Sequence, residues 1–305
     1  MSKRNFDAPG FSGPDGDWNH DFQTVGDARI HFVREGQGAP VFLLHGWPEF
    51  WWTWHRVIPG LSQDFDIVAP DLRGFGDSSK PGKGGNTPPT AEIHAADIIG
   101  LADALGIDRF AVVSHDVGAY VAQQIARSYP DRLTRLFFFN APYPGIGRRW
   151  VDAGHVQEIW YQSFNQLAWA PELIGHNRET CRIYFENMIA HWSHANGAFD
   201  GQIDHWVDNF MKPGNLEGGF AWYAASHPAR VALIRDGAPA LPKIETPSRF
   251  FWGRHDPIIP SAWTDRLPDY FVDPVVEFAE DAGHFVQMEM PESTCRNIRA
   301  HFSGL

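Results

Sequence analysis

Short apolar segments alternate with longer amphipathic segments along most of the chain. The short segments are rich in β-branched and aromatic residues and are followed by turns, which predicts buried strands. We expect strands at residues 28–33, 41–44, 67–69, 110–113, 136–139, 248–252 and 275–279. Helical spacing predicts helices at 92–105, with Gly106 as a stop, at 119–128, before Pro130, and at 291–302. This alternation is typical of a parallel sheet with helices on both faces.

The alternation stops between residues 142 and 241. That stretch has no clear short apolar strand and is aromatic and helical in pattern. It holds Trp150, Trp160, Trp169, Trp192, Trp206 and Trp222. Because strand–helix alternation returns afterwards, we expect one α/β core domain, residues 1–141 and 242–305, with a helical cap domain, residues 142–241, inserted into it. The Gly-, Pro- and Asp-rich first twenty residues are expected to lie over the surface.

Composition excludes several classes of protein. Lys and Arg total 25 against 37 Asp and Glu, a net charge of −12, which disfavours nucleic acid and anionic membranes as partners. With 43% hydrophobic and 20% charged residues, the 305-residue chain can bury a core. No apolar run approaches the roughly 20 residues that span a bilayer, and the N-terminus lacks an apolar signal segment. Two cysteines, Cys181 and Cys295, make no disulfide framework, so we expect a cytoplasmic protein.

Three titratable residues directly follow predicted strands: Asp116, Asp256 and His284. The carboxyl ends of strands line the ligand crevice of an open α/β sheet, so these side chains could meet there. Asp116 stands between Ser114 and Gly118, and small residues at these positions are typical of a nucleophile elbow, a sharp strand-to-helix turn. Each residue also has a structural alternative: Asp116 as a helix N-cap, Asp256 as a turn former and His284 as an ordinary loop residue.

The chain resembles α/β-hydrolases of the epoxide hydrolase group. Five segments carry the resemblance in order, from about residue 25 to the C-terminus: HGWPE at 45–49, DLRGFGDS at 71–78, SHDVG at 114–118, WGRHD at 252–256 and GHF at 283–285. The resemblance implies the α/β-hydrolase fold, a mostly parallel twisted sheet flanked by helices with an inserted helical cap. It also implies an oxyanion hole from the backbone N–H groups of Trp47 and Val117. Tyr161, in WYQSF, and Tyr223, in AWY, match the two cap tyrosines that protonate an epoxide oxygen in that group.

The type of nucleophile narrows the chemistry. A serine attacking saturated carbon would form a stable ether, whereas a carboxylate forms an ester that water can cleave. Asp116 therefore indicates attack on the electrophilic carbon of an epoxide or a carbon–halogen bond. Asp256 would orient His284, which would activate the water. We expect an epoxide hydrolase that forms a vicinal diol through an aspartyl ester, without a metal or other cofactor, with Trp47, Val117, Tyr161 and Tyr223 contacting the substrate.

Two alternatives stay open: a haloalkane or haloacetate dehalogenase with the same triad, and a binding protein that has lost the chemistry. Haloalkane dehalogenases carry a Trp where this chain has Val117. Fluoroacetate-type dehalogenases carry an Arg just after the nucleophile, but the first Arg on this helix is Arg127, about 16 Å further along. Asn140 stands where some relatives carry the acid, which leaves Asp256 as the better candidate.

Other conspicuous residues are expected to be structural. His45 and Pro48 are predicted to shape a turn, with a cis bond before Pro48. The aromatic cap predicts a small apolar or aromatic-substituted substrate, with Tyr161 and Tyr223 as cap packing if they are not catalytic. A homodimer through an exposed cap face stays open. Packing is expected for most of Trp47, Trp51, Trp52 and Trp54, and a surface position rather than a metal site for His191, His194 and His205.

Overall fold

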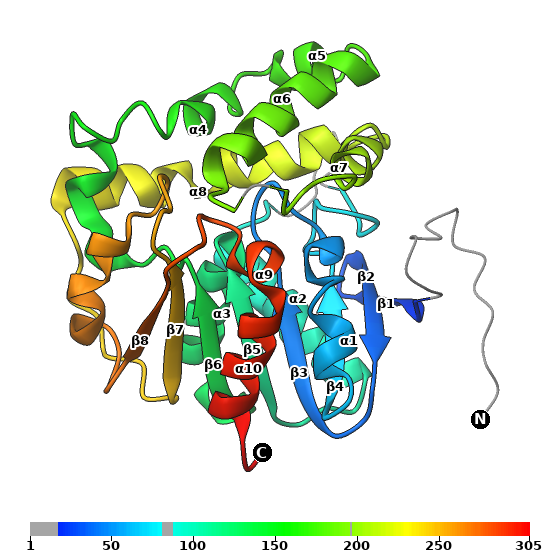
Figure 1. Ribbon diagram of the computed structural model, residues 1–305, viewed down its shortest axis with the longest axis vertical. Coiled ribbons are helices and arrows are strands. Elements are labelled where there is room, and N and C mark those ends of the chain that lie inside the picture. The colour runs from blue at the N-terminus through cyan, green and yellow to red at the C-terminus, as the bar shows by residue number, and fades with distance from the viewer. Residues whose placement is uncertain (1–17, 81–87, 196) are drawn as a thin grey trace.

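A single sheet organises the part of the chain that the computed structural model describes, residues 18–80, 88–195 and 197–305. Eight strands pair there in the order β1-β2-β4-β3-β5-β6-β7-β8 (Figure 1). β1 and β2 are antiparallel to their neighbours, and β4 to β8 with β3 are parallel. The strands are β1 (His20–Val25), β2 (Ala28–Glu35), β3 (Ala39–Leu44), β4 (Phe65–Pro70), β5 (Phe110–His115), β6 (Leu133–Phe139), β7 (Ser248–Gly253) and β8 (Val275–Ala279).

The seven predicted strands are confirmed, and the eighth, β1, was missed. β4 and β5 are buried at every residue, which explains their continuous apolar sequences. β1 is an edge strand with the mixed sequence HDFQTV and only partial burial, so it carries no apolar run. Most of the N-terminal segment expected on the surface, residues 1–17, lies outside the described residues.

Helices cover both faces of the sheet. α1 and α10 lie on one face, and α2 and α3 pack together on the other (Figure 1). Gly106 adopts a φ of 70° just after α2, where the sequence predicted a stop. These elements are α1 (Ile58–Leu61), α2 (Ala91–Ala104), α3 (Val117–Ser128), α9 (Val286–Glu289) and α10 (Pro291–Phe302), with the 3₁₀ helices η1 (Trp51–Trp54), η2 (Pro130–Arg132) and η4 (Ser261–Asp269).

The chain between β6 and β7 is helical, as predicted, with no strand among its described residues. Its helices gather over one end of the sheet (Figure 1). They are η3 (Pro144–Val151), α4 (Trp160–Phe164), α5 (Ala170–Ile174), α6 (Arg178–Trp192), α7 (Ile203–Phe210) and α8 (Asn215–Asp236), and α4 to α8 are called the cap helices below. Within the described ranges, every helix is too short or too polar to cross a bilayer.

The turn between β5 and α3 is closely packed against β3. A Cβ atom on Gly118 would lie 2.3 Å from the carbonyl oxygen of Leu44 and 2.8 Å from that of His45. Across the same contact, a Cβ atom on Gly46 would lie 2.5 Å from Cβ of Asp116. Only glycine therefore fits at both positions without moving the backbone.

We expect Gly118→Ala to lower the free energy of unfolding by about 2 kcal/mol or more, because the new methyl group meets rigid backbone. Urea unfolding measures the change. Gly154→Ala is the matched control, because a Cβ atom there would meet nothing within 4 Å. Equal effects of the two changes would contradict the packing argument.

Candidate active site

Asp116 occupies the turn between the end of β5 and the start of α3. Its backbone adopts φ 45° and ψ −112°, a region that non-glycine residues rarely enter. Its side chain makes no capping hydrogen bond to α3, which excludes the N-cap alternative. Instead, Oδ1 accepts a hydrogen bond from the backbone N–H of Trp47 at 2.9 Å. The strained backbone at this turn thus holds the carboxylate against the backbone of Trp47.

Two backbone N–H groups face the Asp116 carboxylate. Burial raises the pKa of Asp116, while His284 and the N–H groups of Trp47 and Val117 oppose that rise and favour the ionised form. These are the two donors that the resemblance assigned to an oxyanion hole. Their positions suit them to stabilise negative charge on an oxygen of this carboxyl group.

His284 and Asp256 form a hydrogen-bonded pair beside Asp116. His284 lies in the loop after β8, and its Nδ1 is 2.8 Å from Oδ2 of Asp256. The opposite nitrogen, Nε2, is buried and has no hydrogen-bond partner among the described residues. Burial alone lowers the pKa of His284, but the carboxylates of Asp256 and Asp116 raise it by more, to about 9. Both carboxylates thus act on one imidazole.

Asp256 is held by four hydrogen bonds. Oδ1 accepts from the backbone N–H groups of Ile258 and Ile259 at 2.7 and 3.0 Å, so the residue also forms a turn. Oδ2 accepts from His284 and, at 2.5 Å, from Nδ2 of Asn140. Asn140 thus supports the acid from the end of β6 instead of replacing it. Burial raises the pKa of Asp256, but His284 and these donors lower it overall.

A third carboxylate, the buried Glu49, adjoins the site, and the sequence analysis did not identify it as a functional residue. Its Oε2 is 2.7 Å from Nδ1 of His115, whose Nε2 is 2.9 Å from the carbonyl oxygen of His284. Oε2 also accepts the backbone N–H of Gly46 at 2.7 Å, next to Trp47. Oε1 accepts from Thr53 at 2.5 Å and Gln287 at 2.7 Å. Glu49 therefore links the turn at Gly46, the end of β5 at His115 and, through His115, the loop that carries His284.

Tyr161 and Tyr223 lie together under the cap, from α4 and α8. Their ring centroids are 5.8 Å apart, and the Trp47 ring stacks on Tyr161 at 5.2 Å and meets Tyr223 edge-on at 5.3 Å. Burial, and the negative charge of Asp116, raise the pKa of both tyrosines. Both hydroxyls therefore remain protonated at neutral pH.

A cavity of about 670 Å³ reaches Asp116, whereas His284 and Asp256 are not among its lining residues. Asp116, Val117, Tyr161 and Tyr223 all line it, whereas the Trp47 ring packs behind the tyrosines and is 1% exposed. The rest of its wall combines the aromatic side chains of Tyr120, Trp150 and Trp222 with alanine, proline and leucine residues. A cavity of this size, mostly apolar with a few placed polar groups, suits a small organic ligand.

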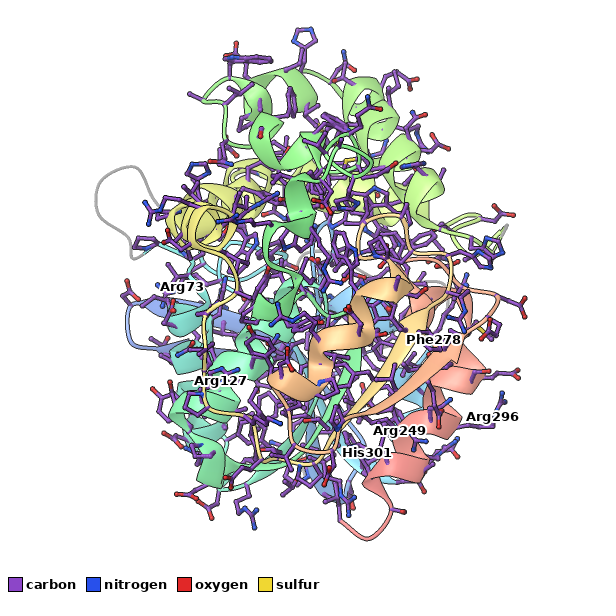
Figure 2. The ribbon with its side chains drawn as sticks, turned by 90° about the vertical axis from the view of Figure 1, so that its left-hand side faces the viewer. Arg73, Arg127, Arg249, Phe278, Arg296 and His301 are labelled. Atoms are coloured by element: carbon purple, nitrogen blue, oxygen red, sulfur yellow. The ribbon has the colours of Figure 1, made fainter. Side chains whose placement is uncertain are left out.

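Other predicted residues lie elsewhere. The cis bond before Pro48 is confirmed, as is the burial of Trp47, Trp51, Trp52 and Trp54. His45 is structural, because its Nε2 accepts the backbone N–H of Leu72 at 3.0 Å. Arg127 lies beside the sheet below the cap helices (Figure 2) and donates to the carbonyl oxygen of Pro242 at 2.5 Å.

The three histidines considered for a metal site have separate contacts. His191 is 2.6 Å from Oε2 of Glu158, His194 stacks on His255, and His205 packs on Trp52. They are therefore not arranged around a common point.

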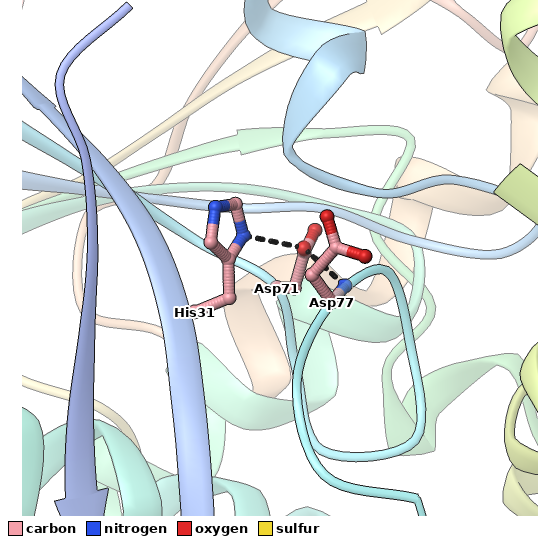
Figure 3. Close-up of side chains that lie close together, drawn as sticks. All are labelled: His31, Asp71 and Asp77. Carbon is pink, nitrogen blue, oxygen red and sulfur yellow. Dashed lines mark hydrogen bonds and ion pairs between the residues drawn. The ribbon is translucent and has the colours of Figure 1, made fainter. Parts of the chain in front are cut away.

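A different group of possible metal ligands, His31, Asp71 and Asp77, clusters between β2 and the turn after β4 (Figure 3). Nδ1 of His31 is 2.7 Å from Oδ2 of Asp71, and its Nε2 is 2.8 Å from Nδ1 of His20. Asp71 also accepts the backbone N–H of Asp77 at 2.8 Å. Both imidazole nitrogens are thus occupied, so the cluster fixes the turn through hydrogen bonds.

An acidic residue on a strained strand-to-helix turn, within reach of a His–Asp pair, is the arrangement of an α/β-hydrolase enzyme. Residues 39–171 match the family described as alpha/beta hydrolase fold. A soluble epoxide hydrolase from Corynebacterium sp. (strain C12) is 31% identical over 297 residues, which cover 94% of this chain and 98% of that protein. The chain therefore belongs to the epoxide hydrolase family of the α/β-hydrolase superfamily.

The chain is also similar to a solved epoxide hydrolase structure and to a dehalogenase. The structure of the epoxide hydrolase CorEH without ligand has a TM-score of 0.82 and 27% identity, covering 94% of this chain and 99% of that one. A fluoroacetate dehalogenase from Burkholderia sp is 28% identical over 290 residues, which cover 92% of each protein.

The Glu49 network generates a test of stability. Burial raises the pKa of Glu49, but His115 and the other hydrogen-bond donors lower it to about 2. Because the folded pKa lies below the ordinary value of 4.5, the ionised group stabilises the fold above pH 4.5, and this contribution is lost as the pH falls toward 2. We expect Glu49→Gln to reduce the free energy of unfolding at pH 7 by roughly 3 kcal/mol, with a smaller difference from the wild type at pH 3.

Urea unfolding at both pH values measures this difference, and Glu280→Gln, at an exposed carboxylate, is the control. A Glu49 deficit that is equal at pH 7 and pH 3 would mean that its charge does not stabilise the fold.

Proposed function

We propose that this protein is an epoxide hydrolase that opens an epoxide to a vicinal diol through an ester on Asp116. The observation that carries the proposal is the pair of buried, protonated tyrosine hydroxyls in the cavity that Asp116 also lines. A departing halide needs no proton, whereas an epoxide oxygen leaves as a basic alkoxide and must receive one. Residues 142–241 would act as the cap domain that supplies both hydroxyls.

In the first step, a carboxylate oxygen of Asp116 attacks one ring carbon, and the bond from that carbon to the epoxide oxygen breaks. Tyr161 or Tyr223 gives its proton to that oxygen, which leaves a hydroxyl group on the bound product and a tyrosinate on the protein. Two hydroxyls that point at one oxygen would also orient the ring for in-line attack.

Ester formation removes the negative charge of Asp116, one of the groups that raise the pKa of His284. The pKa of His284 falls accordingly, and its proton restores the tyrosine. His284 is then neutral, with Nε2 available, and Asp256 keeps Nδ1 as the protonated nitrogen. The charge lost at Asp116 thus prepares the base for the second step.

In the second step, His284 takes a proton from water, and the resulting hydroxide attacks the ester carbonyl carbon of Asp116. Negative charge develops on the carbonyl oxygen, where the N–H groups of Trp47 and Val117 would stabilise it. The tetrahedral intermediate then expels the diol alkoxide, which takes the proton from His284. The Asp116 carboxyl group finally passes its proton to His284, which restores the starting carboxylate and imidazolium, and water and epoxide have become diol.

We expect His284→Gln to trap the ester. After addition of styrene oxide, the intact mass should rise by one substrate mass, located on the peptide that contains Asp116. The double variant Asp116→Asn with His284→Gln is the control and should stay unmodified. A single variant that still turns over without any adduct would contradict covalent catalysis, and no reaction in the wild type would favour a binding protein.

The two tyrosines generate a separate test. Tyr161→Phe and Tyr223→Phe should each slow ester formation, and the double change should slow it by roughly a hundredfold or more, because no acid meets the alkoxide. Rapid-mixing kinetics separate this step from ester hydrolysis, which should persist. Tyr184→Phe is the matched control, because this buried cap hydroxyl instead donates to Asn165 at 2.6 Å.

A dehalogenase would give the opposite pattern. The double Phe variant would keep its alkylation rate, and halide would be released from a chloroalkane or fluoroacetate faster than any diol forms.

A further inference from the structure

One cation, Arg230, lines the cavity that Asp116 and the two tyrosines also line. Arg230 lies on α8, seven residues after Tyr223, and both side chains line the same cavity. Seven residues make nearly two helical turns, so the two positions share a face and are about 10 Å apart along the axis. Long side chains on a helix point toward its N-terminus, which brings the guanidinium of Arg230 toward Tyr223.

Arg230 forms no ion pair with any described residue. Two carboxylates that line the same cavity do not pair with Arg230. Asp236 pairs with Arg235 at 2.7 Å, and Glu92 forms no ion pair with Arg230. The guanidinium carbon of Arg230 instead lies 5.6 Å from the ring centroid of Trp150. Desolvation lowers its pKa, yet a guanidinium remains charged at neutral pH. A partly desolvated cation without a counter-ion is costly unless a ligand supplies one.

Building on the proposed function, we propose that Arg230 binds a carboxylate of the substrate, and that this enzyme hydrolyses aromatic epoxides bearing a carboxylate remote from the ring-opening carbon. The planar fork of a guanidinium matches a carboxylate with two parallel hydrogen bonds. Among the described residues that line the cavity, Arg230 is the one basic group, which suits a monoanion better than a phosphate dianion.

The lining between the two ends suits an aromatic spacer. Tyr161 and Tyr223 would hold the epoxide oxygen at one end, and Arg230, whose backbone lies about two helical turns along α8 from Tyr223, would hold the carboxylate. Trp150 and Trp222 line the same cavity and offer ring faces and edges to an aromatic group. A para-substituted phenyl ring would separate the two polar ends by a suitable length.

The experiment compares three probes that differ only at the para position: styrene oxide, 4-(oxiran-2-yl)benzamide and 4-(oxiran-2-yl)benzoate. For the wild type, we expect kcat/KM to be about ten- to a hundredfold higher for the benzoate than for the benzamide, mainly through KM. Arg230→Met should remove this preference while the reaction with styrene oxide persists. Arg230→Lys should recover part of it.

Arg235→Met is the matched control, because Arg235 lies on the same helix, is exposed and is not among the residues that line the cavity. This variant should keep the full preference for the benzoate. Raised salt should reduce the preference of the wild type little, because the ion pair would form inside the cavity.

Calorimetry with unreactive 4-ethylbenzoate tests the anion site without catalysis. Binding that weakens at least tenfold in Arg230→Met but not in Arg235→Met would support the site even if no epoxide is opened, in which case only the proposed function fails. Diol formation without a benzoate preference, or with one that survives in Arg230→Met, would overturn the inference and leave the proposed function intact.

Discussion

The backbone strain at Asp116 is the constraint on which the rest of the site depends. A residue held at φ 45° between a strand and a helix persists only when its surroundings fix it. Here the fixing contacts are close approaches at two glycines: Gly118 against the backbone carbonyl oxygens of Leu44 and His45, and Gly46 against the side chain of Asp116. The same approach brings the N–H of Trp47 to the Asp116 carboxylate. Asp116 and the N–H group of Trp47 are therefore positioned by the packing of the turn after β3 against the turn after β5.

Buried carboxylates and imidazoles form a connected series of contacts in this site. Asp256 pairs with His284, whose carbonyl oxygen contacts His115, and His115 pairs with Glu49. Because a buried charge without a partner is expensive, each carboxylate here has several hydrogen-bond donors. The Nε2 atom of His284 has no hydrogen-bond partner among the described residues, and in the same network neither has Oε1 of Gln287. The other nitrogen of His284 is fixed by Asp256, which leaves Nε2 as the nitrogen that could act as a base.

The cap and the core contact each other at the site, not only around it. The backbone N–H of His284 donates to the carbonyl oxygen of Trp192 at 2.8 Å, and Nε1 of Trp206 donates to that of Pro48 at 2.8 Å. A Cβ atom on Gly218 of α8 would lie 2.1 Å from the carbonyl oxygen of Gly74. The contact at Gly218 fixes α8, whose cavity residues include Tyr223 and Arg230, against the turn after β4.

The sequence by itself determined the sheet, the helical insertion and the order of the residues that follow strands, because burial on both faces leaves continuous apolar runs and sharp turns require glycine. It did not reveal β1, whose edge position needs no such run, or Glu49, which has no local pattern and acquires its role from four partners distant along the chain or in the turn. Asn140 was noticed as a substitute for an acid, but only the fold placed its amide on Asp256. The sequence also did not indicate Arg230, because whether a cation has an ion-pair partner depends on the groups that the fold places around it. Periodicity records burial, whereas partnership between polar groups depends on tertiary packing.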